Sequence, residues 1–176
     1  MELIAIRHTQ VSVARGICYG ISDLLPATNF KADVLPVKKA LLSLHPDKVY
    51  TSPLKRCSML ASECGFEDVS GDNRLMEMNF GKWEMASWHT IAGDYAEKWF
   101  ADYVNVRCPG GESLRDMITR VEKFLEELKT KKYEQIICFT HSGPIRVMNH
   151  ILKNLALENL FDIDIAFGGV YSFRVF

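Results

Sequence analysis

Two histidines and two arginines stand just after stretches of the sequence that have the pattern of buried strands. They are Arg7, His8, Arg56 and His141. Arginine side chains bind phosphate oxygens through paired hydrogen bonds, and a neutral imidazole can attack phosphorus and hold the phosphoryl group covalently. Glu77, in a loop-like stretch before Gly81, is the carboxyl group available to protonate a leaving oxygen. The residue types therefore indicate a phosphate-ester site with a histidine nucleophile.

Each of these residues alone has an ordinary explanation. An Arg-His pair is usually a polar boundary at a strand end, Arg56 fits a surface helix, and Glu77 fits a solvated loop. The sharpest competing interpretation is a metal site in which His8, His141 and Glu77 are the ligands. Arg7 and Arg56 would repel a divalent metal but attract a phosphate. We therefore favour phosphate over metal and expect no metal at this site.

Short apolar runs that alternate with amphipathic segments must position these side chains. Strands are predicted at Leu3–Arg7, Lys48–Thr51 and Gln135–Thr140, and Gly168-Gly169 precedes a closing strand at Val170–Phe176. In open α/β sheets, ligands bind beyond the carboxyl ends of the strands, so the strand ends should bring the site to one edge. We expect an α/β fold with three layers, α/β/α, in which helices cover both faces of a mostly parallel central sheet.

Four helices are expected between and after these strands. Their approximate ranges are Ala32–Leu44, Ser52–Cys64, Leu114–Leu128 and Pro144–Leu155. In the second helix, Ser52 would be the capping hydroxyl, Pro53 the first helical residue and Gly65 the stop. Ser113 and Asp116 predict a capping box at the start of the third helix, whose apolar side chains share one face. Helix N-termini at the sheet edge would offer backbone N–H groups to an anion.

Size and composition bound the class of protein. The chain has 176 residues, 48% of them hydrophobic and 24% charged, which fits one domain over residues 1–176. A net charge of −1 gives no field that would draw nucleic acid or a membrane surface. No apolar run approaches the ~18 residues of a membrane span, and the N-terminus lacks a signal-peptide pattern. Five cysteines without CxxC spacing fit reduced thiols, so a cytoplasmic protein is expected.

A stretch rich in aromatic residues, about Phe80–Gly111, separates the two halves that form the sheet. Its aromatic side chains include Trp83, Trp88, Tyr95, Trp99, Phe100 and Tyr103. We interpret this stretch as a partly helical insertion that packs on the domain and could also form a wall over the active site. Packing onto the core is the ordinary role for any one of these rings. As a group, they predict at least one aromatic side chain at the mouth of the pocket.

Six short motifs, in order along nearly the whole chain, resemble those of the histidine phosphatase superfamily, also called the phosphoglycerate-mutase-like family. The motifs are Arg7-His8-Thr9, Gly16–Asp23, Ser52–Arg56, Leu75–Glu77 with Phe80–Glu84, Gly110–Ser113 and Thr140–Gly143. Each motif is weak alone, but their order makes the resemblance specific. It implies the phosphoglycerate-mutase-like fold and phosphomonoesterase activity without a metal or an organic cofactor.

The resemblance also implies a role for each matching residue. His8 is the nucleophile, and Glu77 first protonates the leaving group and then activates water. The phosphoryl group is held by Arg7, Arg56 and His141, with the backbone near Ser142. The substrate-binding set further includes Tyr19, Gly20 and Ser52. The partner implied is a small-molecule phosphate ester, and the sequence does not indicate the oligomeric state.

Two positions depart from the family pattern. Thr9 replaces the glycine that usually follows the histidine, and Ser142 stands where many members have glycine. The glycine backbone normally helps to orient the imidazole, and threonine has a narrower φ/ψ range. Neither change removes a reacting group, so we expect activity to be retained.

Within the superfamily, the short chain and the segments Cys18–Asp23 and Met78–Met85 look most like the alpha-ribazole phosphatase branch. That resemblance implies hydrolysis of alpha-ribazole 5′-phosphate in assembly of the cobalamin nucleotide loop. Alternatives are a broad-specificity small-molecule phosphatase, a phosphoglycerate-mutase-type phosphotransferase and, less favoured, a non-catalytic member that binds phosphorylated ligands.

Overall fold

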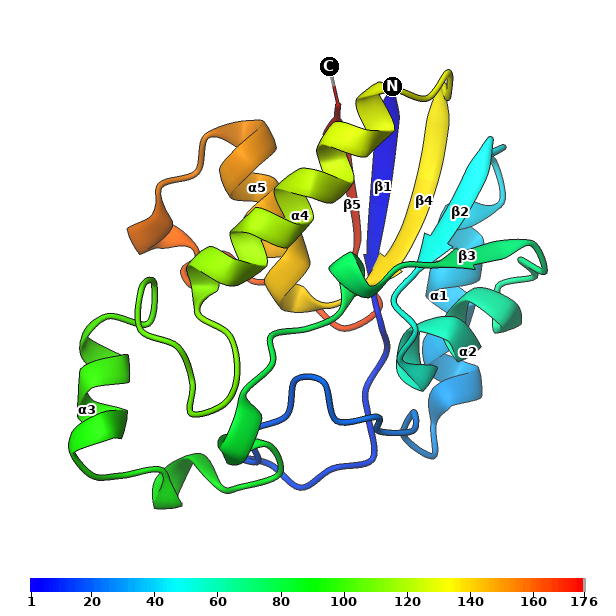
Figure 1. Ribbon diagram of the computed structural model, residues 1–176. Helices are drawn as coiled ribbons and strands as arrows, with labels where there is room; N and C mark the ends of the chain where they lie inside the picture. The colour runs from blue at the N-terminus through cyan, green and yellow to red at the C-terminus, as the bar shows by residue number, and fades with distance from the viewer. Residues whose placement is uncertain (176) are drawn as a thin grey trace.

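The computed structural model describes residues 1–175, which form a five-stranded sheet between helices (Figure 1). The strands are β1 (Glu2–Arg7), β2 (Lys48–Thr51), β3 (Val69–Gly71), β4 (Gln135–Thr140) and β5 (Val170–Arg174). Their order is β3-β2-β4-β1-β5, and only β5 runs antiparallel to its neighbour. The predicted mostly parallel sheet is confirmed. Phe176, the last residue of the predicted closing strand, lies outside the described residues.

Alternation of apolar side chains along β1 explains why helices cover both faces of the sheet. Leu3 and Ala5 pack in one core with α4 (Leu114–Lys129) and α5 (Ser142–Lys153). The intervening Ile4 and Ile6 pack in a second core, on the opposite face. The helices of that second core are α1 (Phe30–Leu41) and α2 (Lys55–Glu63). Figure 1 shows the same three layers, so the predicted α/β/α arrangement is confirmed.

The start of α2 differs from the prediction. The helix begins at Lys55 after an extended Leu54, so Ser52 does not cap it and Pro53 is not its first residue. The hydroxyl of Ser52 instead lies 2.8 Å from Nε2 of His141, in the interior of the protein. Ser52, which the sequence indicated as a helix cap, therefore contacts the His141 ring and does not cap α2. The predicted end is correct, because Gly65 follows the helix with a positive φ of 93°.

The predicted capping box of α4 is confirmed. The hydroxyl of Ser113 accepts a hydrogen bond from the backbone N–H of Asp116, and the Asp116 carboxylate accepts one from the Ser113 N–H. The apolar side chains of this helix pack on the sheet as expected. One consequence is that the segment before α4 enters the helix in a fixed direction, beside the segment that carries Glu77.

The aromatic-rich stretch contains α3 (Asp94–Ala101) and two short 3₁₀ helices, η2 (Gly81–Trp83) and η3 (Trp88–Thr90). It lies below the carboxyl ends of the strands in Figure 1, next to the long segment that follows β1. An isolated bridge between Ile17 and Ser87 joins these two segments. The edge of the sheet that should carry the site is therefore covered by irregular structure.

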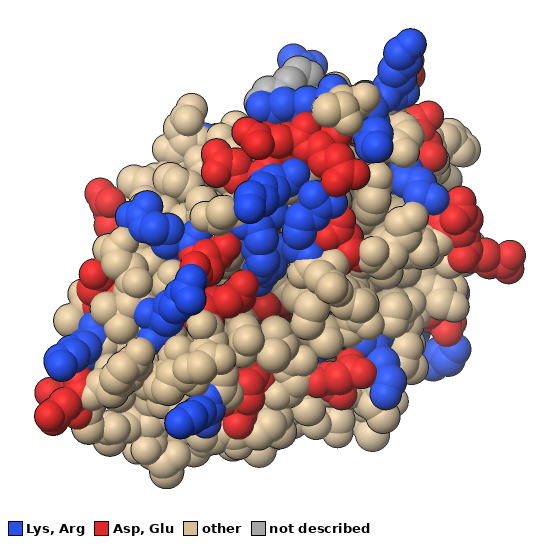
Figure 2. Space-filling view, in the orientation of Figure 1, with Lys and Arg blue, Asp and Glu red and all other residues tan. Residues whose placement is uncertain are grey.

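The surface carries charges of both signs. On the face drawn in Figure 2, a central group of basic side chains is bordered by acidic ones. Within residues 1–175, none of the helices is long and apolar enough to cross a membrane.

Candidate active site

His8 stands one residue beyond β1, and its main chain is fixed on both sides. Its N–H donates to the carbonyl of Thr140 at the end of β4 (3.0 Å), and its carbonyl accepts from the N–H of Gly168 (3.1 Å). Gly168 has a positive φ of 67°, a conformation that glycine adopts without strain. The turn before β5 can therefore close against His8. The imidazole is almost completely buried, at 2% exposure.

The hydrogen bond of the His8 ring fixes its tautomer. Nδ1 lies 2.7 Å from the carbonyl oxygen of Thr9, which can only accept, so Nδ1 carries the proton and Nε2 keeps a free electron pair. Burial, helped by the charge of Arg56, lowers the pKa of His8 to about 3, although the bond to Thr9 opposes the shift. The imidazole is therefore neutral at physiological pH. Thr9 orients it through a backbone carbonyl, so the ring needs no glycine for this contact.

His141 and Arg56 form a fully buried pair beside His8. The two imidazole ring centres are 5.1 Å apart. Nε of Arg56 donates to Nδ1 of His141 (3.2 Å), so the proton of His141 sits on Nε2, which donates to the hydroxyl of Ser52. Burial, and then the nearness of the second titratable ring of His8 and the charge of Arg56, hold the pKa of His141 well below its usual range. His141 is thus a neutral donor.

The loop of residues 20–22 binds the two terminal nitrogens of Arg56. The Arg56 guanidinium donates to the carbonyls of Ser22 (2.7 Å) and Gly20 (2.5 Å). The carboxylate of Glu84 in turn accepts the backbone N–H groups of Gly20, Ile21 and Ser22 at 3.0–3.1 Å. Burial would raise the pKa of Glu84, but hydrogen bonds from the Ser22 hydroxyl and from the backbone N–H groups of Gly20, Phe80 and Ile21 together lower it. Gly20 therefore contributes to the support of Arg56.

Glu77 lies against the N-terminus of α5. Its carboxylate accepts from the backbone N–H of Gly143 (3.2 Å) and from the hydroxyl of Ser142 (3.1 Å), and the N–H of Met78 adds a third donor (3.0 Å). A Cβ at position 143 would lie 2.1 Å from Oε1 of Glu77, so glycine is required for this approach. The donors expected to hold phosphate near Ser142 thus hold the acid in this structure.

Arg7 and Arg146 are two cations in the cavity wall. The guanidinium of Arg7 donates to the carbonyl of Ile165 (2.5 Å) and lies 3.7 Å from the ring centre of Phe167, while its Nε has no partner among residues 1–175. Arg146 donates to the carbonyls of Leu160 (2.9 Å) and Ile163. Among the described residues, no ion pair with a carboxylate involves Arg7, Arg56 or Arg146. Positive charge without a carboxylate partner suits an anionic ligand.

A cavity of about 450 Å³ opens on these groups. Of the predicted site residues, the cavity wall contains Arg7, His8, Tyr19, Glu77 and Ser142. The others, which are Gly20, Ser52, Arg56 and His141, are not in that wall and lie behind it. Burial raises the pKa of Tyr19, while Arg7 and Arg56 oppose the shift. The far part of the wall is aromatic, as expected, and includes Phe80, Trp88, Trp99, Phe100 and Tyr103 from the predicted insertion.

A family model described as the histidine phosphatase superfamily (branch 1) matches residues 3–175. The chain belongs to this superfamily. It is therefore a phosphatase with a phosphoglycerate-mutase-like fold. The family resemblance stated from the six motifs is confirmed.

The chain is similar to several enzymes over most of their length. Phosphoserine phosphatase 1 from Hydrogenobacter thermophilus is 28% identical and aligns with 92% of this chain and 80% of its own. The structure of phosphoglycerate mutase from Thermus thermophilus is 30% identical, with a TM-score of 0.77 and coverage of 98% and 92% of the two chains. Alpha-ribazole phosphatase from Shigella flexneri has a TM-score of 0.89 at 21% identity, covering 99% and 95%. The names differ in substrate, so similarity alone does not choose among substrates.

Three residues near the site were not predicted from the sequence. Arg146 follows Ser142 by four residues and Gly143 by three, so helix geometry places it above the start of α5, and that spacing was a usable signal. Glu84 lies in one of the six motifs, but its contact with the loop of residues 20–22 depends on tertiary structure. Phe167 stacks on Arg7 from the turn before β5, and no local pattern announces that contact.

Proposed function

We propose that this histidine phosphatase is a phosphomonoesterase that works through a phosphohistidine at His8. The observation that carries the proposal is the hydrogen bond between Nδ1 of His8 and the carbonyl of Thr9. That bond leaves the electron pair on Nε2, in the wall of a cavity that also contains Arg7 and Glu77. A neutral, oriented imidazole is the form that can attack phosphorus.

In the first step, Nε2 of His8 forms a bond to phosphorus as the bond from phosphorus to the ester oxygen breaks. The electron pair of that bond goes to the ester oxygen, which takes a proton from Glu77 and leaves as the alcohol. In the second step, the Glu77 carboxylate takes a proton from water, and the water oxygen attacks phosphorus. The bond from phosphorus to Nε2 breaks, its electron pair returns to His8, and inorganic phosphate leaves.

Arg7, Arg56 and His141 would stabilise the phosphoryl oxygens in both steps. Arg7 is in the cavity wall, and Arg56 directs three of its five N–H donors to protein groups. His141 presents the Nε2 proton that now contacts Ser52. Fixed cations directed at the transferring group supply the charge stabilisation that phosphoryl transfer requires. This chemistry needs no metal.

The substrate favoured by the cavity is alpha-ribazole 5′-phosphate, which has a flat benzimidazole base. Trp88, Phe100 and Tyr103 line the same cavity as His8 and Arg7, and Phe161 faces Tyr103 with ring centres 5.2 Å apart. Stacking of a base on an aromatic side chain contributes roughly 1–3 kcal/mol in single-stranded nucleic-acid sites.

One observation favours a second candidate, a phosphatase for small esters that carry another negative charge, such as phosphoserine. Arg146 is in the cavity wall close enough to Arg7 for their charges to interact, and it donates to neutral carbonyls. A substrate carboxylate could pair with this guanidinium. The name of the Hydrogenobacter thermophilus relative points in the same direction.

A screen of phosphate esters in EDTA tests these proposals. The screen compares alpha-ribazole 5′-phosphate, phosphoserine and 3-phosphoglycerate by the release of inorganic phosphate. We expect turnover in EDTA and the highest kcat/KM for the ribazole ester. A higher kcat/KM for phosphoserine would favour the second candidate, and isomerised 3-phosphoglycerate without phosphate release would indicate a mutase. Activity that EDTA abolishes and a divalent metal restores would overturn the metal-free mechanism.

The five free cysteines support a cytoplasmic location for the enzyme.

A further inference from the structure

Glu77 lies in a segment that has no regular secondary structure to hold it. The segment runs from the end of η1 (Asn73–Leu75) to the start of η2 at Gly81. A general acid must lie within hydrogen-bond reach of the leaving oxygen, so its main chain must be fixed. The bonds from Gly143 and Ser142 orient the carboxylate but do not hold the backbone that carries it.

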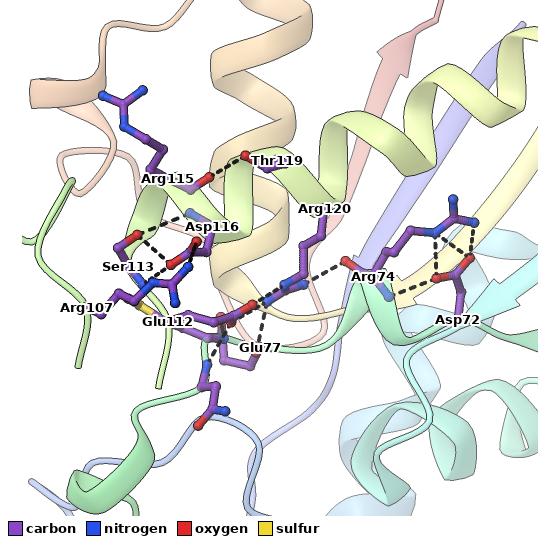
Figure 3. A network of polar contacts seen from close by, with 12 residues as sticks. Asp72, Arg74, Glu77, Arg107, Glu112, Ser113, Arg115, Asp116, Thr119 and Arg120 are labelled. Atoms are coloured by element: carbon purple, nitrogen blue, oxygen red, sulfur yellow. Dashed lines mark hydrogen bonds and ion pairs between the residues drawn. The ribbon is translucent and has the colours of Figure 1, made fainter. Parts of the chain in front are cut away.

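Arg120, on α4, holds that backbone. Its guanidinium donates to the carbonyl of Glu77 itself (3.1 Å) and to the carbonyl of Arg74 (2.7 Å), three residues earlier. The Arg120 side chain is mostly buried, at 17% exposure, and therefore more ordered than a surface arginine. Figure 3 shows the guanidinium reaching from the helix to the Glu77 segment.

Glu112 holds Arg120 and the far side of the same segment. Its carboxylate accepts from Nε (2.9 Å) and Nη2 (3.2 Å) of Arg120, the two-point geometry that fixes a guanidinium plane. The same carboxylate accepts from the backbone N–H of Asn79 (3.0 Å), and the N–H of Glu112 donates to the carbonyl of Asn79 (2.8 Å). The backbone is thus gripped at Glu77 and again two residues later.

We propose that Arg120, held by Glu112, is a positioning residue that sets the place of the Glu77 carboxyl group in the reaction. This inference rests on the proposed acid role of Glu77. Arg120 is absent from the cavity wall, so it acts through Glu77 and touches no substrate. The Glu112 of the Gly-Gly-Glu-Ser motif then has a function at the active site as well as before a helix.

The test compares Arg120→Met with Glu77→Gln on two kinds of ester. p-Nitrophenyl phosphate has a good leaving group and needs little proton donation, whereas alpha-ribazole 5′-phosphate and phosphoserine leave as alkoxides. We expect Arg120→Met to lower kcat for the better alkyl ester on the order of 100-fold, because a small misplacement of a catalytic group has that effect. KM and the kcat for p-nitrophenyl phosphate should change less than about threefold.

A merely structural role predicts a different pattern. The double variant Arg120→Met, Glu77→Gln should be no slower on the alkyl ester than Glu77→Gln alone, since both changes remove the same function. Equal losses on the two kinds of ester, or losses that multiply in the double variant, would overturn the inference. Arg120→Lys should recover part of the activity, because one donor can still reach the carbonyl of Glu77.

Controls separate this inference from the proposed function. Arg115→Met is the matched control on the same helix, because Arg115 is exposed and bonds Asn105 (2.9 Å), and Figure 3 shows it pointing away from Glu77. It should stay within about twofold of the wild type. If Arg120→Met does not fold, Glu112→Gln carries the same expectation and the same contrary outcome. If the loss of kcat in Glu77→Gln does not depend on the leaving group, the acid role of Glu77 is wrong and the inference about Arg120 is wrong with it. If the loss depends on the leaving group in Glu77→Gln but not in Arg120→Met, only the inference about Arg120 is wrong.

Discussion

His8 and Glu77 are held in different ways, and the difference matches the parts proposed for them. His8 is locked by one ring hydrogen bond and by burial, which keep its nucleophilic nitrogen neutral. Glu77 accepts from three separate donors, the N–H of Met78 and two groups in the first turn of α5. A carboxyl group that both gives and takes a proton needs contact with solvent and substrate, and its place in the cavity wall provides both.

Glu77→Gln should discriminate between leaving groups. Glutamine keeps the size of the side chain but cannot donate a proton and take it back, so kcat for an alkyl ester should fall by about 100-fold or more. The loss on p-nitrophenyl phosphate should stay below about tenfold. Steady-state kinetics on both esters checks this, and equal losses would mean that Glu77 does not act mainly as an acid.

The lowered pKa of His8 predicts a loss of stability in acid. The pKa is 6.5 in the unfolded chain and about 3 in the fold, so below pH 6.5 the unfolded chain takes up a proton that the folded chain does not. The resulting loss of folding stability is zero above pH 6.5 and grows as the pH falls to about 3. At pH 5 it amounts to about 2 kcal/mol, at 1.36 kcal/mol for each pH unit below 6.5.

Urea unfolding of the wild type and of His8→Asn at pH 7 and pH 5 measures this effect. The neutral asparagine removes the titration, so the wild type should lose about 2 kcal/mol more than the variant between the two pH values. Identical losses would show that His8 titrates alike in the folded and unfolded chains.

At the scale of elements, the strands were predictable where a strand is an apolar run. β2 and β4 have the predicted bounds, and β1 begins one residue early. β1 and β4 are buried on both faces and leave a continuous apolar pattern, whereas in β2 only the alternate residues Val49 and Thr51 are buried. β3 was missed because Val69, Ser70 and Gly71 form no apolar run, and only pairing with β2 makes them a strand. The predicted start of α2 was wrong because Ser52 forms a hydrogen bond with His141 across the sheet edge. Local propensity cannot predict such a tertiary contact.

In the site, too, the features that follow from strand patterns were predictable and those that depend on tertiary contacts were not. The ends of β1 and β4 bring His8 and His141 together because their parallel pairing continues to Arg7 and Thr140, as expected for strand ends at one edge of a sheet. The sequence could not predict how deeply each site residue is buried. Arg56 and His141 lie behind the cavity wall, because their bonds to Gly20, Ser22 and Ser52 use contacts between distant segments.

Gly143→Ala tests the first turn of α5 as a support for the acid. The added Cβ would meet Oε1 of Glu77 at 2.1 Å and the end of the Met117 side chain at 3.0–3.1 Å, so the flexible carboxylate must move and the methionine must give slightly. We expect kcat for an alkyl ester to fall by about 10- to 100-fold. The free energy of unfolding should change by less than about 1 kcal/mol, because alanine favours the helix.

The matched control for this change is Gly71→Ala at the end of β3, where an added Cβ meets none of the described atoms within 4 Å. Its kcat should stay within about twofold of the wild type. If Gly143→Ala behaved like Gly71→Ala, the contact between Glu77 and the start of α5 would be irrelevant to turnover.

At the scale of the whole molecule, the proposed function assigns the phosphate chemistry to the sheet edge and the selection of substrate to the irregular segments that line the cavity. Trp88 and Trp99 stack at 6.1 Å, and Trp99 also meets Phe80 and Trp83, so much of the aromatic cluster is packing. Phe100 differs, because it lines the cavity and is 52% exposed. Among the rings of the aromatic-rich stretch that line the cavity, Phe100 is the most exposed, so its removal should disturb the fold least.

Phe100→Ala should therefore reduce selectivity without reducing the basic chemistry. Loss of stacking worth roughly 1–3 kcal/mol predicts a fall of about 5- to 150-fold in kcat/KM for alpha-ribazole 5′-phosphate. Turnover of p-nitrophenyl phosphate should be spared. Tyr95→Ala is the control, because Tyr95 is an exposed ring of the same helix that is absent from the cavity wall. Equal effects of the two changes would remove Phe100 from the selection of substrate.

The phosphohistidine at His8 is the central claim, and trapping it is the most direct test. The enzyme is mixed with a ³²P-labelled ester, quenched within milliseconds and digested for mass spectrometry. We expect label on Nε2 of His8, in a bond that is lost in acid and survives in base, and no label in a folded His8→Ala variant. Label on any other residue, or turnover by His8→Ala close to that of the wild type, would contradict the claim.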